Sequence, residues 1–92
     1  MKITTVKDKN GTLIEGPLLI NPEKFKDNRG FFMESWNQNK FNTLLNQEIN
    51  FVQENHSQSK LCVLRGLHYQ LNPNPQGKLV KCINGEIFDV AV

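Results

Sequence analysis

The stretch that decides the fold class is Lys78-Leu79-Val80-Lys81-Cys82-Ile83-Asn84-Gly85-Glu86-Ile87-Phe88-Asp89-Val90-Ala91-Val92. Two short apolar runs, 78–83 and 86–92, flank an Asn-Gly dipeptide, which readily takes the positive φ angles of a type I′ turn. The pattern therefore predicts a β-hairpin with Asn84-Gly85 at its tip. Hairpins of this kind are typical of antiparallel all-β folds.

Other segments share this short, β-branched or aromatic character, which is typical of strands. Including the two strands of the hairpin, the strands predicted along the chain are Lys2–Val6, Pro17–Ile20, Phe31–Trp36, Phe51–Gln58, Leu61–Tyr69, Lys78–Ile83 and Glu86–Val92. Asn10-Gly11 is a second turn dipeptide, and the two prolines of 71–77 predict a loop. The pattern predicts an all-β sandwich or barrel. Because the final strand stops in an apolar run, we expect residues 1–92 to be the N-terminal part of one longer domain.

One segment has helical rather than strand periodicity. Asn37 is a good N-cap, and Phe41, Leu44 and Leu45 then recur at helical spacing. Trp36, directly before the cap, is placed to pack on Phe41 as a hydrophobic staple. We expect a helix over residues 38–45.

Composition excludes several classes of protein. The 92 residues carry 11 Lys and Arg against 9 Asp and Glu, a net charge of +2, and the cations are dispersed. Duplex-binding proteins gather such charge, so nucleic acid is not expected as a partner. No run approaches the roughly 20 apolar residues of a membrane helix, and the first residues lack the apolar core of a signal peptide. We expect a cytoplasmic protein that does not bind membranes, with Cys62 and Cys82 as buried free thiols.

Several polar residues in the predicted strands are candidates for binding or chemistry. Gln53 and Asn55 fall on one face of their strand, where two amides suit recognition of a base or sugar edge, or are simply solvated. A bulge at Gly66 would bring Arg65 and His68 to one cavity, although a structural histidine is the alternative for His68. Lys78 begins a strand after the Pro-rich loop and either points inward or stays in solvent.

A second group surrounds a predicted turn. Arg29 is placed to bind phosphate through its planar guanidinium, with Phe31 or Phe32 supporting a ring, although most such phenylalanines are core residues. Glu34 follows five residues later. The two histidines, His56 and His68, lie 12 apart with none of the spacings of a metal-binding cupin, so no metal is expected.

Five stretches, taken in order, resemble one enzyme family. They are 27–34 (DNRGFFME), 51–57 (FVQENHS), 63–70 (VLRGLHYQ), 76–80 (QGKLV) and 85–92 (GEIFDVAV). Together they resemble the dTDP-4-dehydrorhamnose 3,5-epimerase family over nearly the whole chain. The resemblance implies a cupin jelly roll, a homodimer about twice this length, and no metal or other cofactor.

The implied reaction is epimerisation of dTDP-4-dehydro-6-deoxy-D-glucose at C3 and C5, on the route to dTDP-L-rhamnose for cell-surface polysaccharide. The 4-keto group makes both neighbouring C–H bonds acidic, so a base forms an enolate that is reprotonated on the opposite face. By the resemblance, His68 is the base and Lys78 stabilises the enolate oxygen while also contacting substrate. The other residues implied to bind the nucleotide sugar are Arg29, Glu34, Gln53, Glu54, Asn55 and Arg65. Glu54 departs mildly from the family, where Asp is more usual.

The same resemblance places the family's tyrosine acid, a second histidine and the Asp that orients the base beyond residue 92. Some relatives of the family epimerise only one carbon. We expect the portion beyond residue 92 to decide whether one or both carbons are epimerised. The alternative is a non-catalytic module that binds a nucleotide sugar, or an inactive fragment. A metal-dependent cupin isomerase is a further alternative, and elemental analysis of the purified protein distinguishes it.

Overall fold

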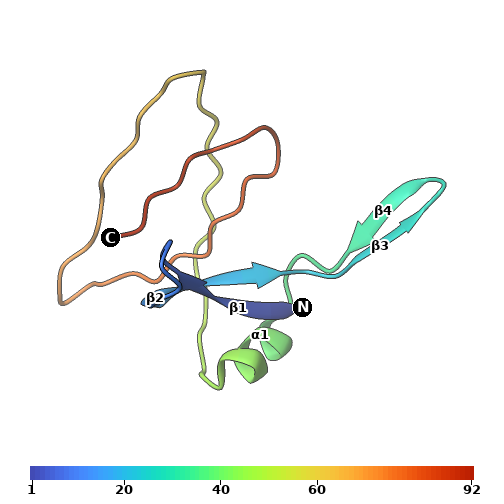
Figure 1. The fold of residues 1–92 in the computed structure, drawn as a ribbon, viewed down its shortest axis with the longest axis horizontal. Coiled ribbons are helices and arrows are strands. Elements are labelled where there is room, and N and C mark those ends of the chain that lie inside the picture. The colour runs from blue at the N-terminus through green and yellow to red at the C-terminus, as the bar shows by residue number, and fades with distance from the viewer. The chain divides into compact units, whose positions relative to one another are not determined.

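The computed structural model describes residues 1–92, and the chain divides into two compact units, Met1–Glu54 and Asn55–Val92. All regular secondary structure lies in the first unit, in the order β1, β2, β3, β4 and α1 (Figure 1). The strands form two separate two-stranded antiparallel sheets. The expected all-β character with one short helix is therefore present in the first unit.

The first sheet joins β1 (Lys2–Lys7) to β2 (Leu13–Asn21). Ile3 pairs with Ile20, and both side chains are half-buried on the same face. The register shifts between Thr5 and Val6, opposite Gly16-Pro17. Proline has no N–H for the ladder and Gly16 has a φ of +107°, so this point of β2 cannot continue regular pairing.

The connection between β1 and β2 is a turn built on Asp8. Its Oδ1 accepts hydrogen bonds from the backbone N–H groups of Asn10 at 2.8 Å and Thr12 at 2.9 Å. Gly11 has a φ of +83°, but Asn10 does not have a positive φ, so the turn is not the two-residue type I′ form. The Asn10-Gly11 turn is confirmed as a turn, with Asp8 supplying the hydrogen bonds.

The second sheet is a short hairpin of β3 (Lys24–Asp27) and β4 (Gly30–Met33). Phe25 pairs with Phe32, and Asp27 pairs with Gly30 across the turn. Strand β3 was not predicted, because Lys-Phe-Lys-Asp has a single apolar residue and resembles a polar loop. The predicted strand 31–36 was too long, because the chain leaves β4 after Met33 and caps the helix.

Helix α1 (Gln38–Leu45) has the bounds that the sequence predicts. The Asn37 side chain accepts a hydrogen bond from the backbone N–H of Lys40 at 3.0 Å, which confirms the N-cap. Asn46 ends the helix in the left-handed conformation, with φ of 50° and ψ of 39°. Asparagine is one of the few residues that tolerate this conformation. With eight residues, α1 is too short to cross a bilayer, and no other helix is present.

Three aromatic rings form the core of the first unit. Phe41, 4% exposed, is the one buried hydrophobic residue of the chain. Its ring centroid lies 4.7 Å from that of Trp36, as the predicted staple requires, and 5.9 Å from that of Phe51. Trp36 and Phe51 meet edge to face at 5.4 Å. This aromatic cluster packs the residues before and after α1 against the helix.

Hydrogen bonds fix the returning chain in that position. Asn42 Oδ1 accepts from the backbone N–H of Ile49 at 3.0 Å and from Gln38 Nε2 at 3.1 Å. Gln38 Nε2 also donates to the Ile49 carbonyl oxygen. These contacts satisfy the backbone of Ile49 and hold the segment that carries Phe51 beside α1.

The second unit has no regular secondary structure, so several predictions were wrong. The expected strands 51–58, 61–69, 78–83 and 86–92, and the hairpin at Asn84-Gly85, do not form. Gly85 does take a positive φ of 79°, but the flanking runs remain unpaired. The backbone hydrogen bonds of this unit are local turns, Val63 N–H to Lys60 and Asn74 N–H to Leu71.

The physical reason is that a strand needs a partner backbone and a covered face. Here the apolar side chains are left in solvent, with Leu64 90% and Phe88 95% exposed. Cys62 and Cys82 are free thiols as expected, but they are exposed rather than buried for the same reason.

Replacing Phe41 with alanine should destabilise the first unit by about 3 kcal/mol, because it removes the central ring of the aromatic cluster. Urea unfolding followed by Trp36 fluorescence measures this, since Trp36 is the single tryptophan. Leu44→Ala, on the exposed side of α1, is the matched control and should cost much less. Equal losses in the two variants would show that the cluster is not the core.

Candidate functional site

The predicted site residues are divided between the two units. Arg29, Glu34, Gln53 and Glu54 belong to the first unit, and Asn55, Arg65, His68 and Lys78 belong to the second. All of them are exposed. Each group is therefore described on its own unit.

Arg29 lies at the tip of the β3–β4 hairpin and is paired with Asp27. The Asp27 carboxylate accepts from the Arg29 backbone N–H at 2.8 Å, and its other oxygen accepts from Arg29 Nε at 3.0 Å and from Nη2. The guanidinium hydrogen bonds lower the pKa of the Asp27 carboxyl, with a smaller contribution from the backbone N–H. The turn thus holds the Arg29 backbone while the side chain stays 90% exposed.

A hollow of about 310 Å³ lies beside this turn, lined by Asp27, Arg29, Gly30, Phe31 and Phe32. It combines a guanidinium with aromatic surface, which is the combination that the sequence analysis assigned to a phosphate and a ring. Its volume is at the lower end of the range for small-molecule sites. Lys24, on β3, places its ammonium 4.8 Å from the Phe31 ring centroid.

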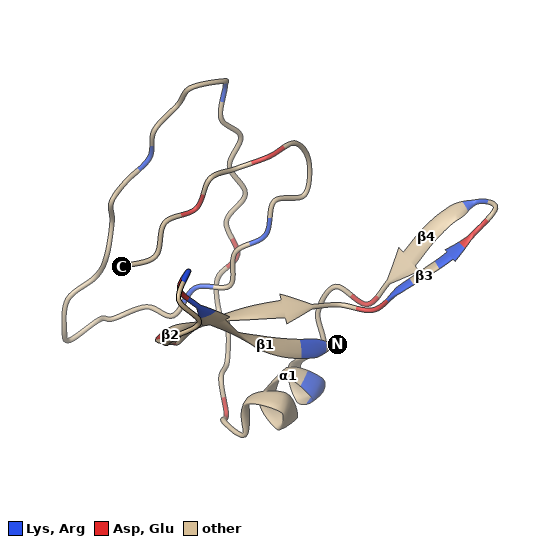
Figure 2. Cartoon of the chain, viewed as in Figure 1, with Lys and Arg blue, Asp and Glu red and all other residues tan.

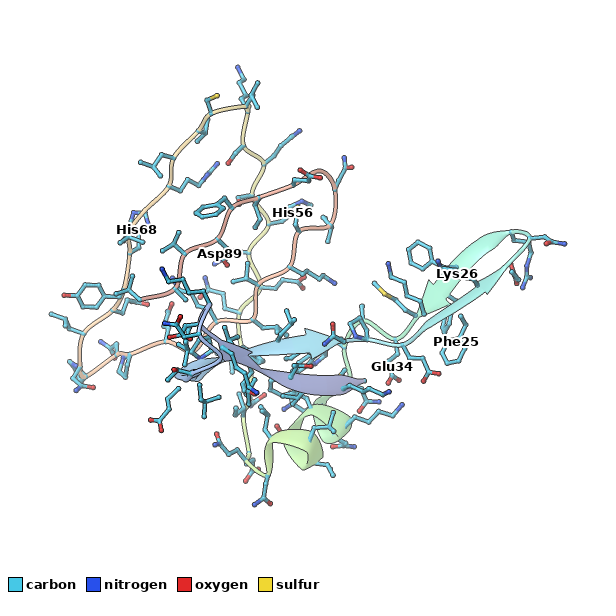
Figure 3. The ribbon with its side chains drawn as sticks, viewed as in Figure 1. Phe25, Lys26, Glu34, His56, His68 and Asp89 are labelled. Carbon is cyan, nitrogen blue, oxygen red and sulfur yellow. The ribbon has the colours of Figure 1, made fainter.

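Glu34 lies just past β4 (Figure 3), and it contacts the start of α1. Its Oε1 accepts from Lys40 Nζ at 2.8 Å, and its Oε2 accepts from Asn37 Nδ2 at 3.2 Å. The hydrogen bond from Lys40, and then the one from Asn37, lower the pKa of the Glu34 carboxyl. Glu34 is therefore a carboxylate with fixed acceptor geometry at neutral pH.

The remaining predicted residues lie on chain without ladder pairing. Gln53, Glu54 and Asn55 follow Phe51 on an extended, exposed segment. Arg65 donates from Nε to Ser59 Oγ at 2.9 Å and from Nη2 to the Gln58 carbonyl oxygen at 3.0 Å. These contacts fix Arg65 to the turn that precedes it.

The predicted bulge at Gly66 does not form, because a bulge requires a paired strand. Gly66 has a φ of +139°, in unpaired chain. His68 and Lys78 are exposed on the extended part of the second unit, and Figure 3 labels His68 there. The described contacts of Arg29, Glu34 and Arg65 join each of them to neighbours in sequence rather than to one another.

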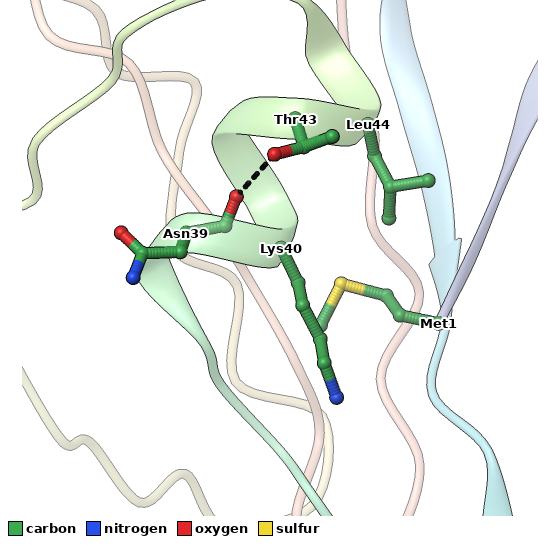
Figure 4. Close-up of a pocket in the computed structure, with 5 residues that line it drawn as sticks. All are labelled: Met1, Asn39, Lys40, Thr43 and Leu44. Atoms are coloured by element: carbon green, nitrogen blue, oxygen red, sulfur yellow. Dashed lines mark hydrogen bonds between the residues drawn. The ribbon is translucent and has the colours of Figure 1, made fainter.

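A second hollow lies between α1 and the start of the chain (Figure 4). Met1, Asn39, Lys40, Thr43 and Leu44 line it, and none of them is a predicted site residue. The Thr43 hydroxyl donates to the Asn39 carbonyl oxygen at 2.8 Å, a contact within the helix. Of its polar side chains, Thr43 is hydrogen-bonded within the helix and Lys40 is paired with Glu34.

Charge is distributed along both units rather than gathered, as Figure 2 shows for Lys and Arg. No three His, Cys, Asp or Glu side chains come together where a metal ion could bind. The partners that sequence reasoning missed are Asp27, Asn37 and Lys40. Local spacing in the sequence could have indicated these partners. Asp27 lies two residues before Arg29 in a turn, so its carboxylate can reach the Arg29 side chain. Glu34 lies three residues before the N-cap Asn37, so its carboxylate can reach the start of the helix.

Comparison with known proteins identifies the family. The family model for dTDP-4-dehydrorhamnose 3,5-epimerase matches residues 11–92, a range that includes every predicted site residue. The chain belongs to the dTDP-4-dehydrorhamnose 3,5-epimerase family. The Asp27–Arg29 turn and the Glu34 carboxylate are therefore features of an epimerase-family chain. No solved structure matches it.

Individual relatives of the family agree. The chain is 57% identical over 81 residues to the dTDP-4-dehydrorhamnose 3,5-epimerase of Shigella flexneri, an overlap of 88% of this chain and 45% of the relative. The enzymes of that name from Salmonella typhimurium and Escherichia coli are 56% and 52% identical over 81 residues, covering 88% of this chain and 44% of each relative. The chain thus spans less than half the length of these epimerases.

Replacing Arg29 with glutamine should raise the pKa of the Asp27 carboxyl toward its usual value, because the guanidinium hydrogen bonds are lost. The carboxyl carbon, followed by NMR between pH 2 and 6, measures this. Lys26→Gln is the control, since it removes a neighbouring cation without touching the Asp27 hydrogen bonds. An unchanged Asp27 pKa in Arg29→Gln contradicts the pairing.

The sign of the pH dependence follows from the direction of the shift. A carboxyl whose pKa is lower in the folded chain stabilises the fold above its unfolded pKa, about 4 for aspartate. That contribution is lost as the pH falls through the lower folded value. The hairpin turn should therefore loosen only in strongly acidic solution.

Proposed function

We propose that these residues supply the base and part of the substrate-binding surface of a nucleotide-sugar 3,5-epimerase. The substrate is dTDP-4-dehydro-6-deoxy-D-glucose, and the product is dTDP-4-dehydro-L-rhamnose, for dTDP-L-rhamnose and cell-surface polysaccharide. The observation that carries the proposal is the family match over 11–92. The names of the relatives from Shigella flexneri, Salmonella typhimurium and Escherichia coli support the same reaction.

By its resemblance to the family motif, His68 is the proposed base. The 4-keto group of the sugar acidifies the C–H bonds at C3 and C5, and a neutral imidazole nitrogen takes the proton. The electron pair of the C–H bond moves into the ring, and the former keto oxygen carries the negative charge of the enolate. A proton returned to the opposite face of the same carbon completes inversion.

Lys78 then stabilises the enolate oxygen. An ammonium positioned where charge develops is worth about 3 to 4 kcal/mol, by analogy with a single oxyanion-hole donor. Lys78 and His68 both lie on unpaired chain in the second unit. Their catalytic arrangement therefore requires the strand pairing of a completed fold.

The other residues bind the nucleotide. Arg29, with Phe31 and Phe32 around the same hollow, offers a cation and ring surface for the diphosphate and the base. Arg65 uses two of its nitrogens on Ser59 and Gln58 and retains further N–H donors for phosphate. Glu34, Gln53, Glu54 and Asn55 supply carboxylate and amide groups for the sugar and base edges.

We further propose that residues 1–92 are the N-terminal part of a single cupin jelly-roll domain that forms a homodimer in the cytoplasm. The aligned relatives are about twice as long as the matched region. The exposed apolar runs of the second unit have the composition of strands, and partner strands would cover them.

In the full-length protein, His68→Ala should reduce deuterium wash-in at C3 and C5 in heavy water by at least about a hundredfold, because the base is removed. Incubation with the dTDP-4-keto sugar and proton NMR of the recovered sugar measure it. His56→Ala, at the other histidine of residues 1–92, should retain wash-in. Retained exchange in His68→Ala would remove His68 from the mechanism.

The alternative is a binding module or an inactive fragment, which is motivated by the 45% of the Shigella flexneri relative that the chain covers. Calorimetry with dTDP on the 92-residue chain separates these cases. Binding without deuterium wash-in supports a module, and Arg65→Ala should then weaken it about tenfold while Lys9→Ala leaves it unchanged. Absence of both binding and cooperative unfolding supports an inactive fragment.

A further inference from the structure

The side-chain amide of Asn37 contacts two different parts of the molecule. On one side it accepts from the backbone N–H of Lys40 at 3.0 Å, and on the other it lies 3.2 Å from Glu34 Oε2. Because a backbone N–H can only donate, the atom that faces Lys40 must be Oδ1. Nδ2 is therefore the atom beside Glu34, and it donates to the carboxylate.

Glu34 is consequently tied to the first turn of α1 through both of its oxygens. Oε2 is held by Asn37, and Oε1 is held by Lys40 Nζ at 2.8 Å. The charged groups that act on this carboxylate are the Lys40 ammonium and the N-terminal ammonium of the chain, both cations. The carboxylate is thus fixed in direction by α1, and α1 is fixed by the Trp36–Phe41 contact.

The choice of capping residue is informative. Ser and Asp cap a helix N-terminus about as well as Asn, but an Asp carboxylate has no donor, and Ser offers only one O–H on a shorter side chain. We propose that Asn37 is a positioning residue for Glu34, which aims the carboxylate at the N–H or O–H donors of the nucleotide sugar. The proposal rests on the proposed function, because that function gives Glu34 its role in binding.

The variant that tests it is Asn37→Asp, which keeps the helix cap and replaces the amide donor with a carboxylate facing Glu34. In the full-length protein, helix content by circular dichroism and the unfolding midpoint should stay at wild-type values. Affinity for dTDP by calorimetry should fall about tenfold, because a hydrogen bond to a charged group is lost. Asn37→Ser, which keeps the cap without adding charge, should lose affinity in the same direction.

A double-mutant cycle separates positioning from a purely structural role. In a Glu34→Gln background, Asn37→Asp should cause little further loss of dTDP affinity, because Asn37 acts through the Glu34 carboxylate. Equal losses in the two backgrounds overturn the proposal. Wild-type dTDP affinity in Asn37→Asp also overturns it.

The titration of Glu34 gives a readout that does not need the ligand. Asn37→Asp should raise the pKa of the Glu34 carboxyl, as followed by NMR, and an unchanged value overturns the proposed contact. If the wild-type protein does not bind dTDP, the proposed function fails, and the role of Asn37 in binding fails with it. The Glu34 titration would still report whether Asn37 holds the carboxylate.

Discussion

The packing of Phe41 between Trp36 and Phe51 is the contact on which the ordered part of the molecule depends. It buries Phe41, the one buried apolar side chain, and stabilises a helix too short to be stable alone. The polar contacts around this cluster also stabilise it, because Gln38 and Asn42 form hydrogen bonds that hold the backbone of Ile49, just before Phe51, beside α1. A small core of three rings therefore organises the chain on both sides of α1.

Asn37 connects this aromatic packing to Glu34, one of the candidate site residues. The residue that caps α1 also donates to Glu34, so the aromatic cluster and the carboxylate are parts of one structure. In the β3–β4 turn, one residue likewise has two structural roles. Asp27 accepts a hydrogen bond from the Arg29 backbone, which shapes the turn, and it also pairs with the Arg29 side chain. In the first unit, local hydrogen bonds direct the side chains that the family resemblance assigns to binding.

The second unit contrasts with the first. It carries His68 and Lys78, the residues proposed for chemistry, on chain whose backbone groups have no ladder partners. The sequence of this unit has strong strand character, yet strand character alone does not form a sheet, because hydrogen bonds and burial both come from a partner. The chain spans 45% of the length of the Shigella flexneri relative, and the apolar side chains of this unit remain exposed.

Helix α1 could be predicted from the sequence to the residue, because a cap, a helical apolar spacing and an adjacent tryptophan are all local signals. The positive φ of Gly85 and the Asp8 turn were also determined locally, as were the residue types of the candidate site. Pairing was not. Strand β3 escaped prediction because only its cross-strand partners make a polar segment a strand, and the strands of 55–92 failed to form because no partner covers them. Sequence determined what depends on neighbours along the chain, and tertiary structure decided what depends on distant backbone, such as the pairing of β1 with β2 and of β3 with β4.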